Sequence, residues 1–167
     1  HAGSVMAEAY PERMKLNFES IISKLYKMNW YGQKNNIGFY VHSLDKKGKP
    51  KKEVNPGVKD LMKDIDLKEY NIVDDEEIIN RMMLPMLIES SRCLEEDIVE
   101  TPVEVDMGLV YGLGFPPFLG GIFRWADSVG LKKLLKETQK LRNLGQCYCP
   151  TDQILKMAKD EKLFHPI

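Results

Sequence analysis

Apolar residues recur at helical spacing through most of the chain, so the sequence predicts a mainly helical protein. The longest predicted helix covers about residues 75–97, with Asp74 as its N-cap and three acidic residues in its first turn. Pro85 lies inside this helix, whose side chains are apolar nearly all round, as expected for a central element. The other predicted helices cover residues 1–9 (stopped by Pro11), about 11–28, 55–65 (capped by Asn55), 101–111, Ser128 or Gly130 to 144, and 154–161 (capped by Thr151 or Asp152).

The segment 101–125 has the clearest local signals. Thr101 suits the N-cap, Pro102 the first helical position, and Glu104 completes a capping box. The helix is expected to end near Tyr111, because two glycines follow within three residues. The next residues, 115–118, read Phe-Pro-Pro-Phe. Connecting segments normally run over the wet surface, so we expect this apolar turn to be buried against the domain or a ligand.

A short strand is predicted at residues 39–42, which are aromatic and β-branched. The basic run 46–52 follows and allows two interpretations. It is a phosphate or nucleic-acid patch, or the solvated tip of a β-hairpin with Asp45 opening the turn. We favour the hairpin, because acidic residues flank the run and no aromatic side chain is interleaved with it. His42 has no neighbouring catalytic motif and is interpreted as structural.

Net charge, hydropathy and cysteine count argue against several kinds of partner and site. A net charge of −1 over 167 residues favours neither nucleic acid nor an anionic membrane as partner. No apolar run approaches the roughly 20 residues of a membrane span. Three cysteines fit a reducing cytoplasm better than a disulfide framework. Cys147 and Cys149 are either half of a metal site or ordinary loop and core cysteines; no second pair has the spacing, so we expect no metal.

No catalytic motif is complete in the chain. A phosphate-binding glycine turn after a strand, a Ser/His/Asp set, a nucleophile elbow and HExxH are all missing from the sequence. The chain starts at His1 without a methionine, within a predicted helix, which suggests a piece of a longer protein. The spacing of residues alone therefore supports a helical domain that belongs to something larger.

A resemblance goes further. The motif Glu-x-Asp-Met-x-Leu-Val-Tyr-Gly-Leu-Gly-Phe-Pro-Pro-Phe-x-Gly-Gly-x-Phe-Arg-Trp ends at Trp125. Together with the segments 5–14, 32–40 and 78–86, it resembles the C-terminal region of the bacterial fatty acid oxidation complex alpha subunit. Proteins of that family join an enoyl-CoA hydratase to an L-3-hydroxyacyl-CoA dehydrogenase. The resemblance covers essentially residues 1–165.

The resemblance implies a fold as well. It is a mainly α fold of the 3-hydroxyacyl-CoA dehydrogenase C-terminal type, with tandem helical domains and one small β-hairpin. Residues 1–70 would be the second half of the first helical domain and would include the hairpin. Residues 71–167 would be the second helical domain. In the family both follow a nucleotide-binding domain.

One binding residue carries over through the resemblance. The family's Leu-Val-Tyr-Gly-Leu-Gly tyrosine binds acyl-CoA substrate and matches Tyr111. A tyrosine at a helix end can offer its ring to an apolar ligand and its hydroxyl to a polar one. Asn80 lies in the second copy of a motif whose first copy contacts substrate, so that role is not transferred and Asn80 is expected to bond locally. At Leu119 relatives often carry His or Arg, and no contact is transferred to it.

The activity implied is NAD-dependent oxidation of L-3-hydroxyacyl-CoA to 3-ketoacyl-CoA, in the cytoplasm. In the family the catalytic His, its carboxylate and the NAD site lie upstream of residue 1, and the hydratase carboxylates lie further upstream. This chain alone is therefore expected to hold no catalytic residue and no cofactor, and to be inactive. The implied partners are acyl-CoA, the upstream domains and the thiolase beta subunit.

Two other functions remain open. The chain could be a purely structural or interaction module that supports domain packing and docks the thiolase subunit. It could also be a stand-alone helical binding protein, which a gene beginning near His1 would favour. The role of Tyr111 separates the first of these from substrate binding.

Overall fold

A computed structural model describes residues 2–14, 19–63 and 73–166. The chain forms two compact units, one of His1–Lys15 with Val73–Ile167 and one of Leu16–Ile72. It is 61% helical, and the described residues contain a single two-stranded antiparallel sheet. The predicted fold class is therefore confirmed. The assignment of residues 1–70 and 71–167 to two domains stays a prediction.

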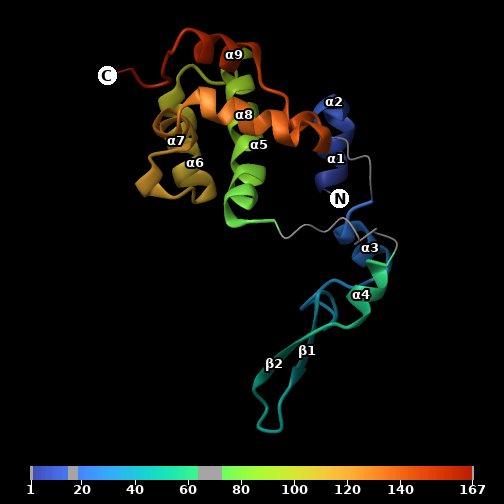
Figure 1. Ribbon diagram of the computed structural model, residues 1–167. Helices are drawn as coiled ribbons and strands as arrows, with labels where there is room; N and C mark the ends of the chain where they lie inside the picture. Colours follow the sequence, from blue (N-terminus) through green and yellow to red (C-terminus); the bar gives the residue numbers. More distant parts are fainter. Residues whose placement is uncertain (1, 15–18, 64–72, 167) are drawn as a thin grey trace. The chain divides into compact units, whose positions relative to one another are not determined.

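The larger unit is built from helices (Figure 1). Its α-helices and 3₁₀ segments (labelled η) are α1 Ala2–Ala9, α2 Pro11–Met14, α5 Asp75–Glu95, α6 Pro102–Leu113, η2 Pro117–Leu119, α7 Ile122–Val129, α8 Leu131–Leu141, η3 Arg142–Leu144, η4 Gln146–Tyr148 and α9 Asp152–Lys159.

Helix α5 is the central element of this unit, as expected, and contacts α7, α8 and α9. The Asp74 side chain caps it by accepting from the backbone N–H of Glu77 at 2.8 Å. Its middle is buried at Leu84, Leu87 and Ile88. The first turns differ from the expectation of burial all round, because Ile78, Ile79 and Met82 are 46%, 51% and 70% exposed.

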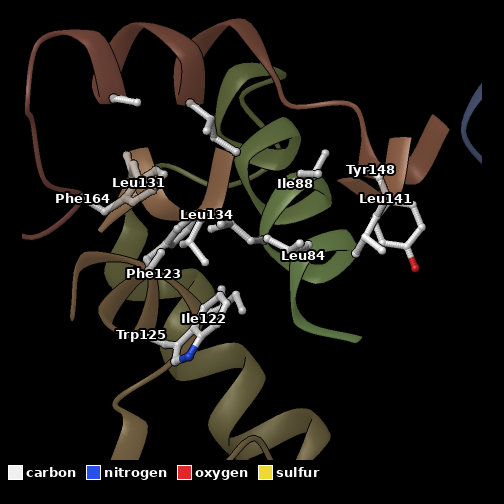
Figure 2. Close-up of a cluster of buried hydrophobic side chains, with 14 of the residues drawn as sticks. Leu84, Ile88, Ile122, Phe123, Trp125, Leu131, Leu134, Leu141, Tyr148 and Phe164 are labelled. Carbon is white, nitrogen blue, oxygen red and sulfur yellow. The ribbon is translucent and has the colours of Figure 1, made fainter. Parts of the chain in front are cut away.

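The core of the unit lies between α5, α7, α8 and α9 (Figure 2). Phe123 of α7 is fully buried and stacks on Phe164 of the C-terminal tail, with ring centroids 4.1 Å apart. Burying each such side chain contributes about 1.5–3 kcal/mol. The buried members are Leu84, Leu87, Ile88, Phe115, Ile122, Phe123, Trp125, Ala126, Leu131, Leu134, Leu141, Tyr148, Ile154, Ala158 and Phe164.

Helices α1 and α2 belong to this unit, and an ion-pair cluster joins α2 to α5. The Arg13 guanidinium donates to Glu89 at 3.1 Å and also pairs with Glu96, both at or near α5. This cluster ties the beginning of the chain to the far end of the long helix, 76 and 83 residues away in sequence.

Two predicted helices have different boundaries in the structure. A continuous helix over 11–28 is wrong, because Ser20 is extended (φ −67°, ψ 150°) and its hydroxyl caps a new helix, α3, at Ser23. Residues 15–18 lie outside the described residues. The helix expected from Ser128 or Gly130 to 144 begins at Leu131 and ends at Leu141, and a separate helix, α7, precedes it.

The smaller unit holds α3 Ile21–Lys27, strands β1 Tyr40–Leu44 and β2 Pro50–Val54, and α4 Gly57–Leu61. Figure 1 shows the hairpin extending beyond α3 and α4. The pair runs from Tyr40↔Val54 to Leu44↔Pro50. Asp45 Oδ1 accepts from the N–H groups of Lys47 and Lys49 at 2.7 and 2.8 Å, which confirms a hairpin tip at the basic run.

Asn55 joins the hairpin of the smaller unit to α4. Its amide donates to Gly38 O at 2.8 Å, and its Oδ1 accepts from the N–H of Gly57 at 3.0 Å. The Asn55 side chain thus binds the first residue of α4, but Pro56 and not Asn55 occupies the N-cap position, and α4 stops at Leu61, sooner than expected. The predicted end of this helix at residue 65 falls within residues 64–72, outside the described residues.

Candidate functional site

The candidate site lies at the C-terminal end of α6. The helix starts as the sequence predicts, with the Thr101 hydroxyl accepting from Glu104 N–H at 3.3 Å and the Glu104 carboxylate accepting from Thr101 N–H at 3.2 Å. It continues two residues past the predicted end and stops at Leu113. Gly114 then takes the left-handed conformation (φ +70°) that ends many helices.

Tyr111 points to solvent from the last turn of α6, with 80% of the residue exposed. Val103 and Met107 precede it by eight and four residues and are 55% and 49% exposed, so the three share one helix face. Beside them, a Cβ added at Gly108 or Gly112 would have no neighbouring atom within 4 Å. The helix therefore presents an uncovered apolar face that ends in a tyrosine hydroxyl.

The apolar turn after α6 is only half buried, contrary to the expectation. Phe115 is 5% exposed and joins the core, whereas Phe118 is 86% exposed. Pro116 and Pro117 are exposed as well, and η2 forms over Pro117–Leu119. Leu119 packs against the core. Phe115 is thus the anchor of the turn, and Phe118, seven residues after Tyr111 in the sequence, is left exposed.

Asp106 ties α6 to the start of α7. Its side chain is 5% exposed, and its two oxygens accept from the N–H groups of Phe123 at 2.9 Å and Arg124 at 3.2 Å. The carboxylate satisfies N–H groups in the first turn of α7, which has no capping side chain of its own. Gly121 permits the approach: a Cβ there would lie 2.2 Å from Asp106 Cγ, at a φ of +113°.

His165 completes the surroundings of Asp106, a pairing that the sequence did not predict. The imidazole Nε2 lies 2.8 Å from Asp106 Oδ2, and both side chains are nine-tenths buried (8% and 5% exposed). The sequence signal that could have revealed it was Asp106 itself, which is the only charged residue of α6 beyond the first turn. A histidine–carboxylate pair suits a general base, but this burial keeps it from contact with a substrate.

The cysteines form no site. They are free and half-buried, and burial raises the pKa of the Cys93 and Cys147 thiols. Within the described ranges no group of three or more His, Cys, Asp or Glu side chains is arranged to hold a metal ion. Among the helices that the structure describes, none is long and apolar enough to cross a membrane.

Two cavities lie away from Tyr111 in the sequence. In the smaller unit, an apolar cavity of about 670 Å³ is lined by aromatic residues that include Tyr26 and Trp30. In the larger unit, a polar cavity of about 280 Å³ is lined in part by Asn80 and Glu137. The Asn80 side chain is buried and makes no hydrogen bond to another described residue, so the expected local bond is not found. His42 lies opposite Lys52 in the strand register of the hairpin, and its structural role stays a prediction.

Known proteins resemble this chain closely. Residues 78–163 match the family described as 3-hydroxyacyl-CoA dehydrogenase, C-terminal domain. The fatty acid oxidation complex subunits alpha of Pseudomonas syringae pv. tomato and of Ectopseudomonas oleovorans are each 48% identical over 164 residues. The same holds for that subunit of Pseudomonas putida strain KT2440. Each alignment covers 98% of this chain, which spans 23% of the length of these relatives.

A solved structure shares the fold. It is described as the dehydrogenase part of multifunctional enzyme 1 from C. elegans, with a TM-score of 0.58 and 24% sequence identity. The match covers 92% of this chain and 35% of the other.

Proposed function

This chain belongs to the family of 3-hydroxyacyl-CoA dehydrogenase C-terminal domains, and on that premise we propose that it is part of a longer fatty acid oxidation enzyme. That enzyme would oxidise L-3-hydroxyacyl-CoA to 3-ketoacyl-CoA and pass a hydride to NAD. Its catalytic His and NAD site would lie in upstream domains. This segment would complete the acyl-CoA site and pack against those domains.

The exposure of Tyr111 is the observation that carries the proposal. Tyrosine in a core buries its ring, but Tyr111 is 80% exposed and stands at the end of an uncovered apolar face. Exposed apolar surface of this kind marks a binding site. An acyl-CoA has an apolar chain and a polar thioester and pantetheine arm, which suit a ring and a hydroxyl presented together.

The test is a full-length alpha subunit in which this segment replaces the matching region of the Pseudomonas putida relative. Such a chimera should oxidise 3-hydroxyacyl-CoA. Tyr111→Phe should raise its KM for acyl-CoA several-fold, because losing one hydrogen bond weakens binding by about 0.5–1.5 kcal/mol. Tyr111→Ala should raise the KM further, and the matched control Tyr26→Phe, at a 65% exposed tyrosine of the smaller unit, should not. An unchanged KM in both Tyr111 variants would refute substrate binding there.

The segment alone should be inactive and should not bind NAD. The histidine–carboxylate pair of His165 and Asp106 is buried, and hydride transfer needs a nicotinamide site that we place in the upstream domains. The purified 167-residue chain, given NAD and 3-hydroxyacyl-CoA, should show no rise in absorbance from NADH. Formation of NADH would overturn this part of the proposal.

A second function, docking of the thiolase beta subunit or of an upstream domain, is favoured by a different observation. Leu113 and Phe118 are 75% and 86% exposed, and exposed apolar patches mark sites of interaction with other proteins. Phe118→Ser in the chimera should weaken co-purification with the thiolase subunit and leave the KM for acyl-CoA unchanged. If co-purification is unaffected by Phe118→Ser and by Leu113→Ser, this docking function is refuted.

A further inference from the structure

The two ends of the segment from Asp106 to Phe123, here called the α6–α7 segment, are joined by the Asp106 carboxylate. This segment holds the end of α6, the turn with Phe115 and Phe118, and the two glycines before α7. Asp106 at its beginning accepts hydrogen bonds from Phe123 and Arg124 at its end, 17 and 18 residues later. Tyr111 lies in this segment, five residues after Asp106 on the same helix.

The Asp106 carboxylate needs a further partner to be stable where it lies. A buried charge is costly unless it is paired and its lone pairs are satisfied. Two backbone N–H groups satisfy it in part, and the His165 imidazole supplies the remaining close contact at 2.8 Å. Facing a carboxylate oxygen, Nε2 donates this bond in the tautomer that places the ring proton on Nε2.

His165 is itself held by Asp127, in the last turn of α7. The Asp127 carboxylate accepts from the backbone N–H groups of Phe164 and His165, both at 2.9 Å. The Phe164 ring stacks on Phe123, the residue whose N–H binds Asp106. The tail therefore contacts α7 through Asp127 and Phe123 and reaches α6 through His165.

We propose that Asp106 and His165 are positioning residues for Tyr111, through which the C-terminal tail holds the acyl-CoA-binding end of α6 in place. The inference rests on the proposed function of Tyr111. Neither side chain would touch the substrate, because both are nine-tenths buried. They would act by joining the two ends of the α6–α7 segment. Their loss would therefore change the affinity for acyl-CoA and not the rate of hydride transfer.

The kinetic test uses the same chimera. His165→Ala should raise the KM for acyl-CoA about three- to tenfold with kcat unchanged within twofold, the pattern of a lost binding interaction. His165→Gln keeps an amide donor and should restore most of the affinity. Asp106→Asn should raise the KM as well, because an amide replaces one of the oxygens that accept these bonds. His42→Ala, in the hairpin, is the matched control and should have no effect.

A double variant distinguishes positioning from general loss of structure. In a Tyr111→Phe background, His165→Ala should raise the KM by much less than it does alone, because both changes act on one contact. Additive effects would overturn the proposal while leaving the role of Tyr111 intact. If Tyr111→Phe has no effect by itself, the proposed function fails first, and the two failures are thereby told apart.

Hydrogen exchange on the 167-residue chain gives a readout that needs no substrate. His165→Ala should speed exchange at the amides of Phe123 and Arg124 at least tenfold, whereas His165→Gln should not. Unchanged exchange at these two amides would show that His165 does not secure the Asp106 junction. Faster exchange with an unchanged KM would show that the junction is structural only. Either result overturns the proposal.

Discussion

Replacing Gly121 by alanine should disrupt the junction between α6 and α7. The added Cβ would lie 2.2 Å from Cγ, 2.3 Å from Cβ and 2.4 Å from Oδ1 of Asp106, far inside van der Waals contact. These are atoms of a buried carboxylate whose hydrogen bonds fix its position, so they cannot turn away freely. The backbone at Gly121, with φ +113°, is also one that alanine rarely adopts.

The expected loss of stability is large for a domain of this size. A backbone held in an unfavourable region costs about 1–3 kcal/mol. Overpacking adds about 1–3 kcal/mol. If Asp106 moves instead, hydrogen bonds to a charged group are lost at about 1.5–3 kcal/mol each. Strain and overpacking together come to about 2–6 kcal/mol, against a typical stability of about 5–15 kcal/mol.

Urea unfolding followed by Trp125 fluorescence measures this change, in a Trp30→Phe background that removes the signal of the smaller unit. A loss of about 3 kcal/mol lowers the midpoint by roughly 1–3 M. Gly108→Ala is the matched control. Nothing lies within 4 Å of its added Cβ, and alanine in a helix is favoured over glycine by about 0.5–1 kcal/mol, so its midpoint should rise. Equal midpoints for the Gly121 and Gly108 variants would refute the reasoning.

Three further predictions concern the core, the cap of α6 and the thiols. Leu84→Ala, at a fully buried position of α5, should lower the free energy of unfolding by about 2–5 kcal/mol in the same urea assay, and a loss below 1 kcal/mol would contradict the central place of α5. Thr101→Ala should cost about 1 kcal/mol, whereas Thr101→Ser should cost little; equal losses would argue against the hydroxyl cap. Burial raises the pKa of the Cys147 thiol, so less thiolate is present at a given pH, and its alkylation by iodoacetamide, followed by mass spectrometry, should still accelerate beyond pH 9 in the folded chain. A rate that levels off by pH 8 would contradict that direction.

Local sequence signals predicted the elements whose capping groups are neighbours in sequence. Thr101 and Glu104 form the expected capping box, and Asp74 caps α5. Helix α7 was missed because its first N–H groups are satisfied by Asp106, on another helix and 17 residues earlier. A cap supplied by tertiary contact leaves no signal beside the helix it serves. Ser20, by contrast, is a residue type that the sequence marks as a possible N-cap. The helical spacing of apolar residues on both sides of it favoured one continuous helix instead.

The candidate site could be predicted in part. The resemblance singled out Tyr111, but composition and spacing could not show that its side chain is exposed. Phe115 and Phe118 look equivalent in sequence, yet the left-handed turn at Gly114 directs one into the core and leaves the other 86% exposed. The pairing of His165 with Asp106 joins residues 59 positions apart, and such contacts depend on the packing of α6, α7 and the tail together.

Contact between acyl-CoA and Tyr111 is the central claim, and photo-crosslinking tests it most directly. An acyl-CoA with a photoreactive group in its acyl chain would be irradiated with the active chimera, and the labelled peptides identified by mass spectrometry. We expect a label on the α6 peptide that contains Tyr111, and excess unlabelled 3-hydroxyacyl-CoA should abolish it. Competable labelling confined to other regions, with none on the 102–113 peptide, would contradict it.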